Sequence, residues 1–193
     1  ESSHYIYVPI IKSLKSILNN ENIFNESWCK EIHSGEKIRS DFSSGSRAKS
    51  HEIFNDPNNL QIKLYMDEFV LTNPLGTYTS NNKLLGVYFL LDNLPPRIKS
   101  KLHSIQLAIL VHSKLVKEKG LNYFLQPLVN DLKMIENGIL IENKLLKGSL
   151  SMIISDNLAA HEIGGLVGSF SGLRRCRFCM CSSEDINQSF ESN

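Results

Sequence analysis

The segment LQIKLYMD, residues 60–67, alternates between apolar and polar or amphipathic residues and ends on an acid. Successive side chains of a β-strand point to opposite faces, so this alternation predicts a strand with one buried face. The residues of that face are Leu60, Ile62, Leu64 and Met66. Asp67 has the parity of Lys63 and Tyr65, so we expect its carboxylate on the opposite face.

A second segment, GSLSMIISD at residues 148–156, also ends a predicted strand on an acid, Asp156. Two further strands are predicted between them, in KLLGVYFLLD (83–92) and SIQLAILVH (104–112). From Lys114 to Gly138 the apolar period becomes that of a helix. Its stripe is formed by Leu121, Phe124, Leu125, Leu128, Leu132 and Ile135. Pro127 interrupts this pattern, so we expect the regular helix to begin beside it.

The order of these elements predicts an α/β fold. Three consecutive strands with short connections favour an antiparallel meander, and the helix then allows a crossover to a fourth strand parallel to the first. In that arrangement the first and fourth strands end at the same edge of the sheet. We therefore expect Asp67 and Asp156 to be neighbours, although they are far apart in the sequence.

The N-terminal part of the chain differs from this region. IIKSLKSIL, within residues 10–18, has the spacing of an amphipathic helix, and a polar stretch without periodicity follows it. The predicted division is a helical preface and linker over residues 1–59, a sheet domain over 60–170, and a cysteine-containing segment and polar tail over 171–193. The chain begins with Glu, so we expect it to be a fragment and the fold to be incomplete.

Composition limits the class of protein. A hydrophobic content of 41% and a charged content of 21% are ordinary for a globular domain, and the net charge of +1 gives no overall basic character. No segment reaches the roughly 18 consecutive apolar residues of a membrane span, so we expect no membrane partner. Three of the four cysteines fall in CRFCMC (176–181), which does not resemble a disulfide framework and favours a reducing compartment.

Two carboxylates held close together repel each other unless a proton or a cation lies between them. Carboxylate oxygens are hard ligands that suit Mg²⁺ or Mn²⁺. Asp67 and Asp156 are therefore candidate ligands of a metal site of the kind that supports phosphodiester chemistry. The alternative for Asp156 is purely structural, since an Asp between a strand and NLAAHE (157–162) is a good helix N-cap. Asp67 by itself is equally compatible with a simple strand end.

Five ordered landmarks over residues 60–179 resemble the catalytic region of CACTA-type (En/Spm-like) transposases and related eukaryotic transposon-derived proteins. That family reads Asp-Gly-Phe-Asn-Pro where this chain has DEFVLTNPLG, and Tyr-Asn-Leu-Pro-Pro where it has LDNLPP. FLQPLVNDL, SDNLAAHEIGG and CRFC match a Gln-Pro-Leu helix, an Asp-x-Pro-Ala element and Cys-Pro-x-Cys. The chain departs at Glu68 for Gly, at Asn157–Ala159 for the Pro-Ala element, and at Arg177 for Pro.

This resemblance implies an RNase H-like fold with a DDE site, in which Asp67 and Asp156 are the first two of three acids. It implies a nuclear enzyme that binds one or two Mg²⁺ or Mn²⁺ ions, cleaves the DNA at transposon ends and transfers the strands. The resemblance is also compatible with a homo-oligomer, in which the partner is a second copy of the chain. We identify no third acid in this sequence: Glu162 comes too early, and Glu184 and Asp185 lie in the polar tail.

Cys176 and Cys179 have the Cys-x-x-Cys spacing of half a structural zinc site. His161 is a candidate further ligand, and Cys181 is either a third ligand or uninvolved. The alternative is a pair of reduced thiols with no metal. Close by, Arg174, Arg175 and Arg177 could contact DNA phosphates, or could form an ordinary solvated surface.

Three functions follow. The first is a fragment of an active transposase. The second is a catalytically inactive, domesticated or decayed derivative that binds DNA or protein. The third is an interaction module stabilised by zinc, which predicts bound zinc and no response to Mg²⁺ or Mn²⁺.

Overall fold

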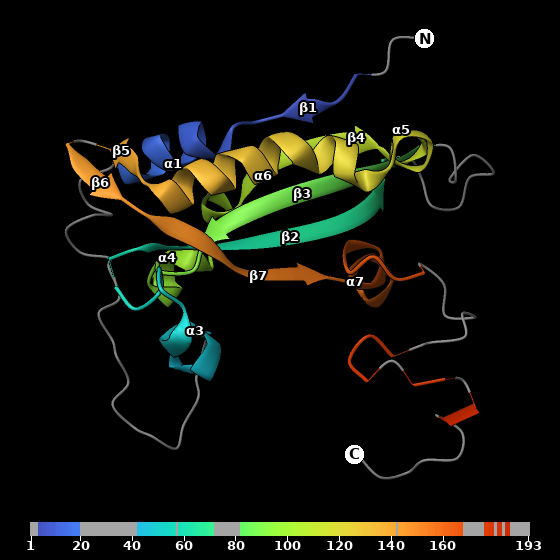
Figure 1. Cartoon of the computed structure of the whole chain (residues 1–193). Coiled ribbons are helices and arrows are strands. Elements are labelled where there is room, and N and C mark those ends of the chain that lie inside the picture. The colour runs from blue at the N-terminus through green and yellow to red at the C-terminus, as the bar shows by residue number, and fades with distance from the viewer. Residues whose placement is uncertain are drawn as a thin grey trace. The chain divides into compact units, whose positions relative to one another are not determined.

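The computed structural model describes residues 4–19, 42–56, 58–71, 82–141, 143–167, 176–179, 181–182 and 184–185. The chain divides into two compact units, Glu1–Ile153 and Ile154–Asn193, and each is considered by itself. The main feature of the first unit is a five-stranded mixed sheet with strand order β1-β4-β3-β2-β7 (Figure 1). These strands are β1 (Ile6–Tyr7), β2 (Leu60–Val70), β3 (Lys83–Leu91), β4 (Gln106–His112) and β7 (Gly148–Ser155).

The predicted antiparallel meander is confirmed. β2 pairs antiparallel with β3 and β3 with β4, and the register places Asp67 opposite Gly86. β2 extends three residues beyond Asp67, to Val70, so the acid lies within the strand and not after its last residue. A register irregularity between Val87 and Tyr88 interrupts the β3–β4 ladder.

The predicted crossover is also confirmed, because β7 lies beside β2 and runs in the same direction (Figure 1). The Leu60 amide donates to the Lys147 carbonyl at 2.8 Å, and the Ser151 hydroxyl donates to the Ile62 carbonyl at 3.0 Å. The second contact lies further along both strands than the first, as parallel pairing requires. The connection runs through helix α6, which supplies the length that a parallel crossover needs.

Two helices, α1 (Ile10–Leu18) and α6 (Leu121–Asn137), cover one face of the sheet (Figure 1). Each presents an apolar stripe at helical spacing to that face, and burial of such a stripe provides most of the stability of a helix in a protein. The buried helical residues are Ile10, Leu14, Leu18, Phe124, Leu128, Leu132 and Ile135. The buried β2 residues are Leu60, Ile62, Leu64 and Met66, the face that the alternation predicts.

The prediction for Pro127 is wrong, because α6 runs through this residue without a break. The chain is interrupted instead at Gly120, whose φ of +83° separates α5 (Ser113–Lys119) from α6. Proline in a helix interior removes one backbone hydrogen bond. Phe124 and Leu128, on either side of Pro127, are both almost fully buried, and this packing outweighs the lost bond.

Several short elements had no clear signal in the sequence. β1 pairs with β4, and a hairpin of β5 (Ile139–Ile141) and β6 (Lys144–Leu146) follows α6, with Asn143 in its turn at a φ of +64°. The expected polar linker contains η1 (Phe42–Ser44) and α3 (Ser46–Ser50), and the rings of Phe42 and Phe54 pack edge to face 5.2 Å apart. The remaining elements are α4 (Pro96–Lys99) and η3 (Leu102–Ser104). The predicted three-part division of the chain stays a prediction.

The second unit begins within the last residues of β7 and contains helix α7 (Asn157–Ile163). The helix that NLAAHE predicts is therefore present. It ends before Gly164, and Gly165 adopts a φ of +71° that L-residues rarely take. A turn at residues 177–179 directly follows Cys176 and includes Cys179, the two cysteines of the CRFC motif.

Candidate functional site

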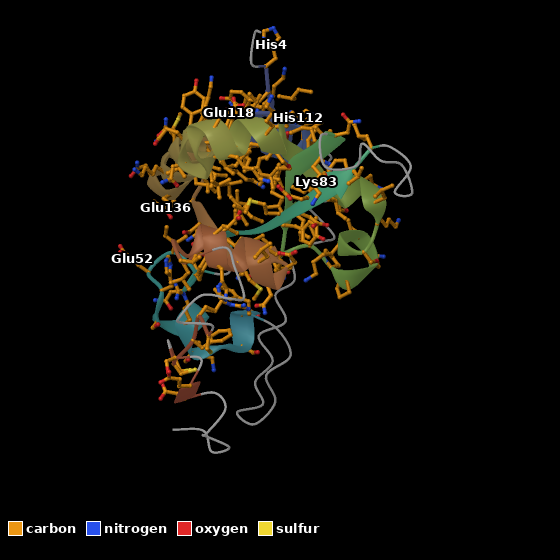
Figure 2. The ribbon with its side chains drawn as sticks, turned by 90° about the vertical axis from the view of Figure 1, so that its right-hand side faces the viewer. His4, Glu52, Lys83, His112, Glu118 and Glu136 are labelled. Atoms are coloured by element: carbon orange, nitrogen blue, oxygen red, sulfur yellow. The ribbon has the colours of Figure 1, made fainter. Side chains whose placement is uncertain are left out.

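Asp67 is a half-buried residue of β2 on the sheet face opposite the apolar residues of that strand. The Tyr65 hydroxyl donates a hydrogen bond to Asp67 Oδ2 at 3.1 Å. Glu68, the next residue, is exposed on the other side, and its carboxylate lies 3.9 Å from the ammonium of Lys83, a residue labelled in Figure 2. The prediction that Asp67 has the parity of Lys63 and Tyr65 is confirmed.

The same face of the sheet carries a buried ion-pair group centred on Asp92, just after β3. One oxygen of this carboxylate lies 2.9 Å from Lys63 Nζ and 2.8 Å from Lys99 Nζ, and the Asp92 side chain is 4% exposed. Burial by itself would raise the pKa of Asp92, but hydrogen bonds from Lys99 and Lys63 outweigh it and hold the pKa below its ordinary value. Lys63 is thus neutralised by Asp92, and Asp67 has the hydroxyl of Tyr65 as its own partner.

Asp156 is the N-cap of α7. Its Oδ1 accepts a hydrogen bond from the Ala159 amide at 2.7 Å, which satisfies one of the free N–H groups of the first helical turn. This capping role, the structural alternative drawn from the sequence, is confirmed. Such a cap contributes about 1 kcal/mol to stability. Capping occupies only one of two carboxylate oxygens, so it does not decide whether Asp156 binds a metal.

The second unit brings three cysteines together. The sulfur atoms of Cys176, Cys179 and Cys181 all lie within 4.8 Å of one another, and those of Cys179 and Cys181 are 3.1 Å apart. Tetrahedral zinc–thiolate geometry separates neighbouring sulfurs by about 3.8 Å, so this spacing suits one ion. Within the described part of the chain, these three cysteines form a group of potential metal ligands, and each offers one sulfur atom.

Two of the three thiols differ in acidity. Backbone N–H groups of Cys179 and Phe178 donate to the Cys176 sulfur and lower the pKa of that thiol to about 7. The hydrogen bond with Cys179 raises the pKa of Cys181 to about 11. Cys176 therefore ionises at a lower pH than Cys181, and a thiolate is the form that binds a metal.

His161, the predicted further ligand, is a nearly fully buried residue of α7, and it is not a member of the three-cysteine cluster. The structure therefore does not bring it together with the thiols that it was expected to join. Arg177 lies beside them, with its guanidinium 4.7 Å from the centre of the Phe178 ring and hydrogen-bonded to the Asn157 side chain. Arg174 and Arg175 lie outside the described residues.

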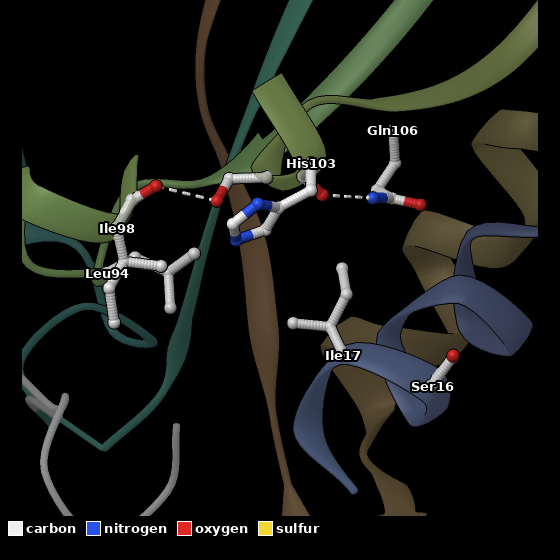
Figure 3. Close-up of a pocket in the computed structure, with 7 residues that line it drawn as sticks. Ser16, Ile17, Leu94, Ile98, His103 and Gln106 are labelled. Carbon is white, nitrogen blue, oxygen red and sulfur yellow. Dashed lines mark hydrogen bonds between the residues drawn. The ribbon is translucent and has the colours of Figure 1, made fainter. Parts of the chain in front are cut away.

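A pocket of about 230 Å³ lies elsewhere in the first unit (Figure 3). Its lining combines the apolar side chains of Ile17, Leu94 and Ile98 with His103 and Gln106. The Gln106 amide donates to the His103 carbonyl at 2.7 Å, and the Ser104 hydroxyl donates to the Ile98 carbonyl at 2.7 Å. None of the described residues that line this pocket is a carboxylate, so it is not the site of Asp67 or Asp156.

Two features of the site were not predicted from the sequence: the Tyr65 hydrogen bond and the Asp92 ion pairs. The sequence left two alternatives for Cys181, and the structure places it in the cluster. The parity of Tyr65 and Asp67 indicates a shared face but not a contact. For Cys181 the available signal was its two-residue distance from Cys179, which the Cys-x-x-Cys pattern does not include.

A mixed sheet covered by helices defines the broad class of the protein as an α/β domain. The family comparison is more specific. Residues 45–189 match the model of transposase family tnp2, and the chain belongs to that family. The comparison with curated proteins finds no match. Among the described residues, no helix is long and apolar enough to cross a membrane.

Proposed function

We propose that this chain is part of the catalytic domain of a transposon-derived DNA transposase. Membership of the tnp2 transposase family is the observation that carries the proposal. Under it, the sheet is the front part of an RNase H-like fold of the CACTA-type DDE class, and the protein acts in the nucleus on the DNA ends of a transposable element. Homo-oligomerisation is part of the same proposal.

Asp67 and Asp156 are the proposed metal ligands. The parallel pairing of β2 with β7 supports them, because parallel strands end at the same edge of a sheet and each of these two carries an acid at or near its end. Carboxylate oxygens on a polar sheet face and at a helix N-terminus fit a hard cation such as Mg²⁺ or Mn²⁺.

When bound, two such ions activate the attacking oxygen and stabilise the leaving oxygen of a phosphodiester. The role of the chain's own residues is to hold the ligating carboxylates in place and to orient them. Asp67 is fixed by Tyr65 on a central strand, and Asp156 is fixed by its cap to α7. Arg177 is the described basic residue proposed to contact a phosphate, and the proposal extends to Arg174 and Arg175. The third acid remains to be identified.

A zinc site is proposed for the second unit, with Cys176, Cys179 and Cys181 as three ligands and His161 as a candidate only if α7 rearranges. The three converging thiols support it. The same observation favours the alternative of a zinc-stabilised module without nuclease activity. A response to Mn²⁺ separates the two, because the alternative predicts none.

The test is thermal unfolding of the chain with and without millimolar Mn²⁺. A ligand that binds only the folded state raises the melting temperature, and saturation at a hundred times Kd adds about 2.7 kcal/mol. Asp156→Asn is the informative variant, because Asn caps a helix as well as Asp does but is a poorer metal ligand. We expect Asp67→Asn and Asp156→Asn to lose the Mn²⁺ response and Glu118→Gln, an exposed carboxylate of α5, to keep it.

Nicking of supercoiled plasmid DNA in Mn²⁺ then separates an active enzyme from an inactive derivative. Metal binding without nicking would support the inactive, DNA- or protein-binding derivative. A melting temperature that Mn²⁺ does not change in the unaltered protein would overturn the carboxylate site.

A further inference from the structure

Asp67 has a built environment on its own strand. Tyr65 lies two positions earlier on the same face of β2, and its side chain runs along the strand so that the hydroxyl reaches Asp67 Oδ2 at 3.1 Å. The Tyr65 side chain is otherwise well exposed, with a relative accessibility of 41%. Within this exposed setting, the hydrogen bond links the Tyr65 hydroxyl directly to the Asp67 carboxylate.

The neighbouring strand has no side chain directly across from Asp67. The residue paired with Asp67 is Gly86, and a Cβ at that position would lie 2.7 Å from Cε2 and 2.8 Å from the hydroxyl of Tyr88. The Tyr88 ring therefore occupies the space that a side chain across from Asp67 would fill.

Tyr65 and Tyr88 are themselves cross-strand partners, with ring centroids 6.4 Å apart. Asp67 is thus bordered by the ring and hydroxyl of one tyrosine and, over Gly86, by the ring of a second. The two tyrosines differ in one respect that an experiment can use: the hydrogen bond that the structure shows to Asp67 comes from Tyr65.

We infer that Tyr65 is a positioning residue for Asp67, and that it fixes the carboxylate through Oδ2 so that the other oxygen takes the divalent cation. The inference rests on the proposed function, because it assigns a supporting residue to a proposed metal ligand. Hydrogen bonds to ligating carboxylates orient them, and removal of such a partner typically lowers metal affinity 10–100-fold. Gly86 contributes indirectly, because its lack of a side chain leaves the space beside the carboxylate that the Tyr88 ring occupies.

The test is a Mn²⁺ titration of the full chain, followed by the EPR signal of free Mn²⁺, with Tyr65→Phe and Tyr88→Phe as a matched pair. Each substitution removes one hydroxyl and keeps its ring. We expect Tyr65→Phe to raise the Kd for Mn²⁺ about tenfold and to change the EPR spectrum of bound Mn²⁺. Tyr88→Phe should leave both unchanged. Urea unfolding without metal should give similar stabilities for both variants, since a single hydroxyl at a half-exposed position contributes little.

Asp67→Asn separates failure of the inference from failure of the proposed function. If Asp67→Asn abolishes Mn²⁺ binding but Tyr65→Phe binds as tightly as Tyr88→Phe, the positioning role is wrong and the metal role of Asp67 stands. If Asp67→Asn binds Mn²⁺ as the unaltered chain does, or the unaltered chain binds none, the proposed ligand is wrong and the inference falls with it.

Discussion

Gly148 approaches Leu60 so closely that a Cβ on the glycine would lie 2.5 Å from the Leu60 Cβ and 2.9 Å from the Leu60 carbonyl oxygen. This contact lies at the start of β7, where the Leu60 amide donates to the Lys147 carbonyl. Only a residue without a side chain allows the two strands to pair at this point. The parallel pairing of β7 with β2, on which the proposed site depends, therefore requires Gly148.

Gly148→Ala should destabilise the fold by about 1–3 kcal/mol, because a methyl group has to displace backbone as well as side-chain atoms. Urea unfolding measures the effect, with Lys147→Ala, an exposed neighbour, as the control. Equal stability of the two variants would show that β7 can move away from β2 without cost.

Asp92→Asn should lower the free energy of unfolding at neutral pH by about 1–3 kcal/mol, because it weakens hydrogen bonds to Lys63 and Lys99. The folded-state pKa of Asp92 lies below its ordinary value of 3.8, so its stabilisation is present above that pH and is lost as the pH falls through the folded pKa. Unfolding measured between neutral and acidic pH should thus show a shallower acid dependence in the variant. Glu52→Gln, at an exposed position, should retain the dependence of the unaltered protein.

Tyr7→Phe should destabilise the first unit by about 1 kcal/mol, because the Tyr7 hydroxyl donates to Asp131 Oδ2 at 2.6 Å and joins β1 to α6. Burial, followed by the Asp131 hydrogen bond, raises the pKa of Tyr7 above its ordinary value of 10.0. The stabilisation of the fold by the Tyr7 hydroxyl is therefore complete below pH 10.0 and declines as the pH rises further. Alkaline unfolding should be less steep in the variant, and Tyr123→Phe, an exposed tyrosine of α6, should behave as the unaltered chain.

The cysteine cluster should show two thiol acidities in the absence of metal. Alkylation by iodoacetamide, followed by mass spectrometry, should reach half its maximal rate near pH 7 at Cys176 and near pH 11 at Cys181. Identical pH profiles at the two positions would contradict the hydrogen-bonding pattern of the cluster.

Metal should protect the same thiols. Zn²⁺ is expected to suppress alkylation of all three cysteines, and Co²⁺ in its place should give thiolate-to-metal charge-transfer absorption that Cys181→Ser weakens. Ser182→Ala, a neighbouring substitution that removes no sulfur, is the control. A Co²⁺ spectrum that Cys181→Ser leaves unchanged would reduce the proposed zinc site to Cys176 and Cys179.

Much of the sheet was predictable from local pattern. The strict alternation of residues 60–67 identified the buried face of β2, and the change to a helical period after His112 identified the crossover that makes β7 parallel to β2. The expectation at Pro127 was wrong, because the penalty of a helical proline is local whereas the burial of Phe124 and Leu128 that offsets it is not.

The sequence by itself therefore determined the type and order of the main elements and which face of each is apolar, because those properties repeat with the period of the backbone. It also led to the prediction that Asp67, Asp156, Cys176 and Cys179 bind metal, which stays a prediction. Only the tertiary structure decided their partners: Tyr65 at Asp67, the Ala159 amide at Asp156, and Cys181 beside the first two thiols. Such contacts depend on side-chain conformation and on strand register, which arise from packing between segments and leave no periodic trace in the chain.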